Sequence, residues 1–155
     1  MMIEPTYTGK QYWLTTVISG LLLSAILSLT YVIFYERLYV ESSYLFSIIY
    51  LIPFVWMNAT IAFFKNKYVW SRFSYGQAFL MSFICGIIGS VMFSGVILML
   101  YTCFGMESRI NLYENGRMMR ELFSPQATAL SLLIINVILS FVYSLIISIF
   151  ARKKN

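Results

Sequence analysis

The chain has 155 residues, of which 60% are hydrophobic and 11% are charged, and its net charge is +5. A soluble domain averages about 45 to 50% apolar and about 25% charged residues, so this composition excludes an ordinary water-soluble fold. His and Asp are both absent from the sequence, which removes the Ser-His-Asp triad and most metal sites. The length allows one domain.

Four windows without any charged residue predict four membrane-spanning helices. The windows are 11–35, 42–64, 73–106 and 122–151, and each exceeds the about 20 helical residues that cross a hydrocarbon core. Within a single membrane domain we place the spans at 13–34, 44–64, 77–100 and 128–150. Continuous apolar runs exclude a transmembrane β-barrel, whose strands alternate in polarity. The predicted fold is an all-α integral membrane protein, a four-transmembrane-helix bundle.

The basic residues predict the orientation of this bundle. Seven of the 11 would lie on one side, among them Lys10, the cluster between the second and third spans, and the C-terminal tail. The other side would hold four, namely Arg37, Arg109, Arg117 and Arg120. By the positive-inside rule we expect both termini in the cytoplasm, with anionic lipid headgroups as partners on that side. No nucleic-acid partner is expected, because the charge is divided among short segments near the membrane.

Small residues recur four apart in three of the predicted spans and predict close helix packing. The stripes are Gly20, Ser24 and Ser28; Gly86, Ser90 and Ser94, with Gly89 and Gly95 beside them; and Ser140, Ser144 and Ser148. Such faces let helix backbones approach one another, which replaces the hydrophobic drive that is absent between helices in lipid. We expect these faces to close the chain's own bundle. Pairing with a partner protein or a second copy is the alternative.

A shift of 66 positions aligns parts of the first and third spans. It places Ser19 and Gly20 on Cys85 and Gly86. The match indicates two related hairpins of the same orientation and predicts that the first and third helices occupy equivalent positions. Chance similarity within a biased membrane composition is the alternative.

The four spans contain no Glu, Lys or Arg, and Asn58 and Asn136 are the polar residues that stand out among their Ser, Thr and Tyr. Proton-coupled transporters use buried ionisable residues, so this composition disfavours such a function. Pro53 removes a backbone donor and is expected to kink the second span. Pro53, Asn58 and Asn136 are the candidates for lining a polar groove, and hydrogen bonding between helices is the alternative role for the two asparagines.

The connection 101–127 is predicted to be a partly helical outer loop between the third and fourth spans. Asn115 and Gly116 form a turn signal, which indicates one short amphipathic piece on each side. Arg117 and Arg120 are the candidates for contacting a partner protein or a lipid headgroup. Solvated charge is the alternative role for these two arginines.

Groups that could carry catalysis are few. The sequence has no phosphate-cradling Gly-rich loop and no motif of paired carboxylates, so no catalytic residue, cofactor or metal is expected. Cys85 and Cys103 lie about 27 Å apart along one helix at 1.5 Å per residue. The two cysteines therefore cannot pair with each other, although Cys103 could join two copies of the chain.

Two short segments resemble a bacterial membrane family. Residues 65–79 read KNKYVWSRFSYGQAF and join a basic turn to the third span, and residues 144–155 read SLIISIFARKKN and end in a basic tail. With four spans and a long polar loop before the last one, the chain resembles the family catalogued as domain of unknown function 4199. The resemblance implies a small bacterial inner-membrane protein without an established activity, and it supplies no catalytic residue.

These exclusions leave a non-enzymatic accessory or scaffold subunit of the bacterial cell envelope as the leading hypothesis. Such a subunit would pack against a partner protein or position lipid. A small transporter or flippase-like protein for a lipid-linked or amphipathic substrate is the first alternative. A channel-forming homo-oligomer is the second.

Overall fold

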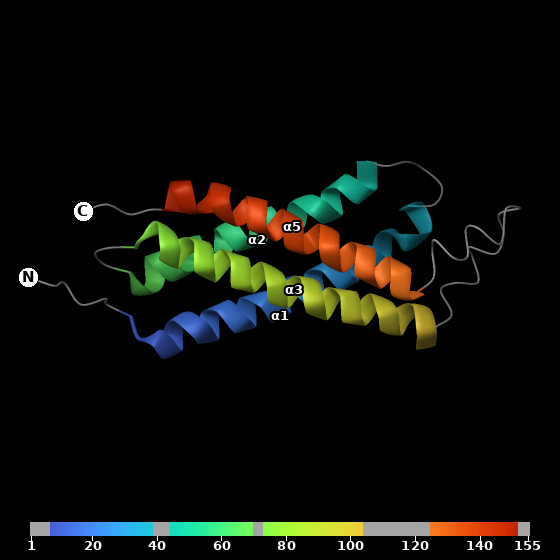
Figure 1. Cartoon of the computed structure of the whole chain (residues 1–155), viewed down its shortest axis with the longest axis horizontal. Coiled ribbons are helices and arrows are strands. Elements are labelled where there is room, and N and C mark those ends of the chain that lie inside the picture. Colours follow the sequence, from blue (N-terminus) through green and yellow to red (C-terminus); the bar gives the residue numbers. More distant parts are fainter. Residues whose placement is uncertain (1–6, 39–43, 70–72, 104–124, 152–155) are drawn as a thin grey trace, which may run out of the picture.

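The structure, a computed structural model, describes residues 7–38, 44–69, 73–103 and 125–151. Its long helices are α1 (Gly9–Leu38), α2 (Tyr44–Tyr68), α3 (Tyr75–Cys103) and α5 (Pro125–Ala151). Each of them contains one of the predicted spans, so the prediction of a four-helix bundle is confirmed. Figure 1 shows that α1 begins, α2 ends, α3 begins and α5 ends at the same end of this bundle.

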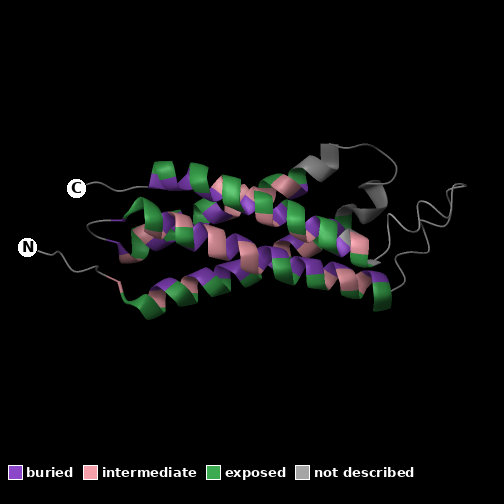
Figure 2. Ribbon diagram, viewed as in Figure 1, coloured by how far each residue is buried: buried purple, intermediate pink, exposed green. Residues whose placement is uncertain are grey.

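All four helices are long and apolar enough to cross a membrane, with apolar stretches of 21 to 29 residues. At 1.5 Å per residue these stretches match a hydrocarbon core of about 30 Å. Large apolar side chains such as Leu29, Val55 and Ile149 are exposed, whereas Ser82, Ser144 and other small polar residues are buried. Figure 2 shows exposed residues along every helix. A surface of this kind is typical of a multi-pass membrane protein.

Helix α3 occupies the centre of the bundle. It packs extensively against both α1 and α5 and also contacts α2, whereas α1 packs against α3 and less extensively against α2. Helix α1 therefore also contacts two helices, α3 and α2, and the equivalence of the first and third helices stays a prediction. The 66-residue offset does recur in the contacts, since Cys85 Sγ lies 3.5 Å from Ser19 Oγ.

Glycines mark where the helices approach most closely. A Cβ atom added to Gly20 would lie 2.7 Å from Ile88 Cβ, and one added to Gly89 would lie 2.7 Å from Leu23 Cδ2. A Cβ atom on Gly86 would collide with Ser140 of α5. Gly95 is different, because it is exposed and a Cβ atom there meets nothing within 4 Å.

Two of the helices begin with the same reciprocal cap. The Gln11 backbone N–H donates to Thr8 Oγ1 and the Thr8 N–H donates to Gln11 Oε1, at 3.3 and 3.0 Å. Ser74 and Gln77 repeat this arrangement before α3, at 3.2 and 3.0 Å. These capping boxes satisfy backbone donors that the first helical turn leaves unpaired.

Hydrogen bonds from buried and half-buried tyrosines join the helices. The Tyr12 hydroxyl donates to the Gln77 carbonyl at 2.6 Å, and at the opposite end the hydroxyls of Tyr31 and Tyr101 are 2.8 Å apart. The Tyr143 hydroxyl donates to the Tyr50 carbonyl at 2.9 Å and links α5 to α2. Such bonds specify which helices are neighbours where lipid offers no competing partner.

We expect Gly86→Leu and Gly20→Leu to lower the stability of the bundle by about 1 to 3 kcal/mol or more, as overpacking does in close-packed interiors. Gly95→Leu is the matched control on α3, because its side chain would enter open space. Thermal unfolding in a mild detergent measures the difference. Equal unfolding temperatures for the Gly86 and Gly95 variants would contradict the packing assigned to Gly86.

Candidate functional site

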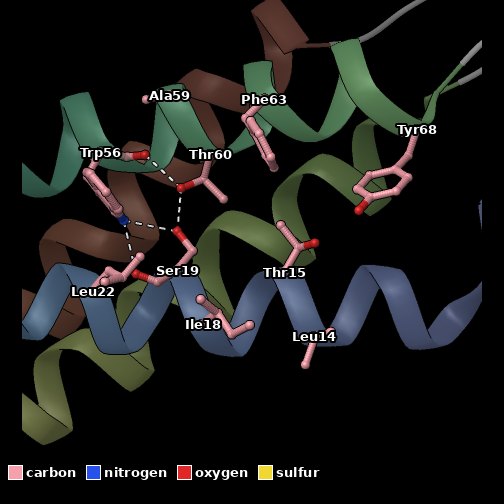
Figure 3. Close-up of a pocket in the computed structure, with 10 residues that line it drawn as sticks. All are labelled: Leu14, Thr15, Ile18, Ser19, Leu22, Trp56, Ala59, Thr60, Phe63 and Tyr68. Carbon is pink, nitrogen blue, oxygen red and sulfur yellow. Dashed lines mark hydrogen bonds between the residues drawn. The ribbon is translucent and has the colours of Figure 1, made fainter.

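A groove of about 520 Å³ lies between α1 and α2. This volume falls in the range of about 300 to 1,000 Å³ that is usual for small-molecule sites. The groove is lined by Leu14, Thr15, Ile18, Ser19, Leu22, Trp56, Ala59, Thr60, Phe63 and Tyr68. Figure 3 shows that the first five come from α1 and the other five from α2.

Helical spacing explains why these residues share the groove. Leu14, Ile18 and Leu22 are four apart and therefore lie on one face of α1. Ala59 and Phe63 have the same relation on α2. The α1–α2 contact is less extensive than the α1–α3 contact, so the two faces remain partly open. Leu14, Ile18 and Phe63 are each about half exposed, at 53%, 48% and 55%, so the groove opens onto the apolar outer surface.

The deep end of the groove contains a closed network of hydrogen bonds, formed by Ser19, Trp56, Thr60 and Cys85. Trp56 Nε1 donates to the Ser19 carbonyl at 3.0 Å and to Ser19 Oγ at 2.9 Å. Thr60 Oγ1 donates to the Trp56 carbonyl at 2.9 Å, so in its short contact with Thr60 the Ser19 hydroxyl is the donor. Cys85 Sγ donates to Ser19 Oγ at 3.5 Å from behind.

Every polar side-chain hydrogen in this network has an acceptor inside the protein. The indole N–H, the two hydroxyls and the thiol all donate within the set of four residues. Buried polar groups in a membrane must be satisfied internally, and here two helices supply most of the partners. A ligand at the deep end therefore meets mainly apolar surface. The network holds α1 and α2 together.

The other end of the groove reaches Tyr68, in the last turn of α2. Lys10, Lys65 and Lys67 lie at this end of the bundle, which we call the lysine end. The ammonium of Lys67 lies over the rings of Phe63 and Tyr68, 5.4 and 5.3 Å from their centroids. The groove is therefore apolar along its length and cationic at one mouth.

An aromatic cluster lies beside this mouth. Tyr7 packs edge-on against Phe64 and Phe73, with ring centroids 5.0 and 6.4 Å apart, and Phe64 packs against Tyr68 at 5.2 Å. Burial raises the pKa of the Tyr7 hydroxyl, because the phenolate would lose hydration. Tyr7 therefore remains neutral at neutral pH and does not offset the lysine charges.

The three residues predicted to line a polar groove differ in their burial. Pro53 is buried, Asn58 is exposed on α2, and Asn136 is buried on α5, where its Nδ2 donates to the Leu132 carbonyl at 2.8 Å. None of the three lines the α1–α2 groove. Their role in a transport path stays a prediction.

The predicted small-residue faces lie mostly inside the bundle. Gly20, Ser24, Gly86, Ser90, Ser94, Ser140 and Ser144 are buried, and Ser28 is half-buried. Ser94 Oγ donates across the α3–α5 contact to the Ala129 carbonyl at 2.7 Å. Within the described residues, Asn136 Oδ1 and Ser144 Oγ are buried without a hydrogen-bond partner.

The remaining residues singled out in the sequence add little to the description of the site. Arg117 and Arg120 lie outside the described residues, as does 104–124 of the predicted outer loop. Both cysteines are free, Cys85 buried and Cys103 exposed. Among the described residues, no group of three or more His, Cys, Asp or Glu side chains could hold a metal ion.

We expect Ser19→Ala to cost only about 0.6 to 1.7 kcal/mol, the range measured for hydrogen bonds between membrane helices. In this variant the Trp56 indole still donates to the Ser19 carbonyl, and the Thr60 hydroxyl still donates to the Trp56 carbonyl. Trp56→Phe removes the shared donor and should cost more. Unfolding in detergent measures both, and the reverse order of stability would contradict the network.

In the folded protein we expect a maleimide to modify Cys103 and to leave Cys85 unmodified, because Cys85 is buried against Ser19. Mass spectrometry of the labelled protein counts the modified thiols. The Cys103→Ser variant should stay unlabelled until a denaturant is added. Cys103 ends α3 at the end opposite to the lysines, so a membrane-impermeant maleimide also reports which end faces outward.

Comparisons with protein-family models, with curated proteins and with solved structures find no match to this chain. The resemblance to the family of domain of unknown function 4199 therefore stays a prediction, and no residue role is taken from it. The functional inference rests on the groove, its hydrogen bonds and the charges at its mouth.

Proposed function

We propose that the chain is a non-enzymatic membrane accessory subunit that positions a lipid in the α1–α2 groove. The observation that carries the proposal is a groove of about 520 Å³ that opens on the apolar outer surface and has mainly apolar walls. In a bilayer such a surface is in contact with acyl chains rather than water. An acyl chain is therefore the ligand whose chemistry fits these walls.

The length of the groove agrees with this ligand. From Leu14 to Leu22 the α1 wall rises about 12 Å at 1.5 Å per residue. One leaflet contributes half of a hydrocarbon core of about 30 Å. The groove therefore matches the depth of one leaflet, and a lipid of that leaflet can enter it sideways without leaving the membrane.

The proposed setting is the bacterial cytoplasmic membrane, with the lysine end and both termini in the cytoplasm. Lys10, Lys65 and Lys67 lie at one end of the bundle, and the positive-inside rule places such an end in the cytoplasm. A protein partner or a second copy would pack on the remaining exposed helix faces. Contact of Arg117 and Arg120 with such a partner is part of the same proposal.

A transporter for an amphipathic substrate is the second candidate, and one observation favours it. Asn136 Oδ1 and Ser144 Oγ lie buried on α5 without hydrogen-bond partners among the described residues, which could provide polar contacts along a path. Gly86 meets Ser140 between these two positions, so α3 and α5 would have to separate. The lipid-positioning function requires no such movement.

Filling the groove tests the proposal. Ala59 is an exposed residue that lines the groove, and we expect Ala59→Phe to exclude most of the lipid that stays with the wild-type protein in mild detergent. Ala62→Phe is the matched control, because Ala62 is an exposed alanine on the same helix that does not line the groove. Native mass spectrometry counts the lipids retained by each protein. Equal retention by the two variants would refute lipid positioning in this groove.

A further inference from the structure

Both walls of the groove continue into a lysine. On α1 the lining residues Leu14 and Ile18 are four apart, and Lys10 lies four residues before Leu14. On α2 Lys67 lies four residues after the lining residue Phe63. Residues four apart share a helix face, so Lys10 and Lys67 extend the two walls at the same end.

The position of Lys67 is specified by the groove itself. Its ammonium is 5.4 Å from the Phe63 ring centroid and 5.3 Å from the Tyr68 ring centroid, and both rings line the groove. Cation–π attraction holds an ammonium over an aromatic face at such distances. The positive charge is therefore kept at the mouth of the groove.

No described carboxylate neutralises this mouth. Among the described residues of the lysine end, the ionised side chains are Lys10, Lys65 and Lys67, with no Asp or Glu. Lys10 and Lys67 are both exposed, so their ammonium groups can reach a headgroup. The charge at the mouth is complementary to an anion whose apolar part occupies the groove.

We propose that the groove selects an anionic membrane lipid over a zwitterionic one. One acyl chain lies along Leu14, Ile18 and Phe63, and the anionic headgroup lies between Lys10 and Lys67. The occupant is a lipid of the leaflet at the lysine end, because the groove spans one leaflet and its charged mouth lies at the headgroup level. This inference rests on the proposed function, since it assigns the headgroup of the lipid that the groove holds.

A competition between two lipids tests the selectivity. The full chain in mild detergent is incubated with equal amounts of phosphatidylglycerol and phosphatidylcholine that carry the same acyl chains, and native mass spectrometry measures the ratio bound. We expect the wild type to prefer phosphatidylglycerol. Lys10→Gln and Lys67→Gln should each reduce that preference roughly fivefold, the effect of one basic residue near an anionic surface. Retention of phosphatidylcholine should not fall.

Lys65 provides the matched control. It carries the same charge in the same turn of α2, but it lies about 160° around the helix from Lys67 at 3.6 residues per turn. We expect Lys65→Gln to keep the preference of the wild type. Equal losses in the Lys65 and Lys67 variants would overturn the assignment, because the attraction would then be diffuse.

Failure of the selectivity can be distinguished from failure of the proposed function. If the wild type binds the two lipids equally and Ala59→Phe still excludes both, the inference about the headgroup is overturned and lipid positioning stands. If Ala59→Phe excludes neither lipid, the groove is not the binding site and both proposals fall.

Discussion

The close approach of α3 to its neighbours is the constraint on which the rest of the structure depends. Lipid tails are as apolar as the helix surfaces, so burial of apolar area gives helices in a membrane little reason to associate. Gly20 lets α1 approach Ile88 and the Cys85 backbone of α3, and Gly86 does the same for Ser140 of α5. Because α3 is packed tightly on both sides, α2 is left with the less extensive contacts.

The groove is a consequence of this difference between the tight packing of α3 and the looser packing of α2. Where α1 meets α2 the lining residues include Trp56 and Phe63 in place of glycines, so the backbones remain apart and space is left between them. The hydrogen bonds of Trp56 and Thr60 with Ser19 then stabilise a pair of helices that close packing alone does not hold. Ser19 also accepts a hydrogen bond from Cys85 of α3, so this one residue of α1 contacts both α2 and α3.

The sequence predicted the helices well and the groove poorly. A helix must stay uncharged over the thickness of the bilayer, so uncharged windows predict the spans without any information on tertiary contacts. The caps at Thr8 and Ser74 explain why α1 and α3 begin before their predicted spans. The face that a residue presents depends on how each helix is rotated in the bundle, which polarity alone does not specify. Asn58 and Asn136 are both polar, yet one is exposed and the other buried. The four-residue spacing of Lys10, Leu14, Ile18 and Leu22 was the feature of the sequence that indicated the α1 wall of the groove.

The two ends of the groove differ in the chemistry they can offer a ligand. At the deep end the side-chain donors of Trp56, Ser19 and Thr60 already have acceptors within the protein, so a polar ligand group would have to break existing bonds in a medium without water to replace them. At the lysine end the charge of Lys67 is exposed and directed by two rings. Affinity from acyl chains is common to all membrane lipids, and discrimination between lipids must therefore come from the headgroup end.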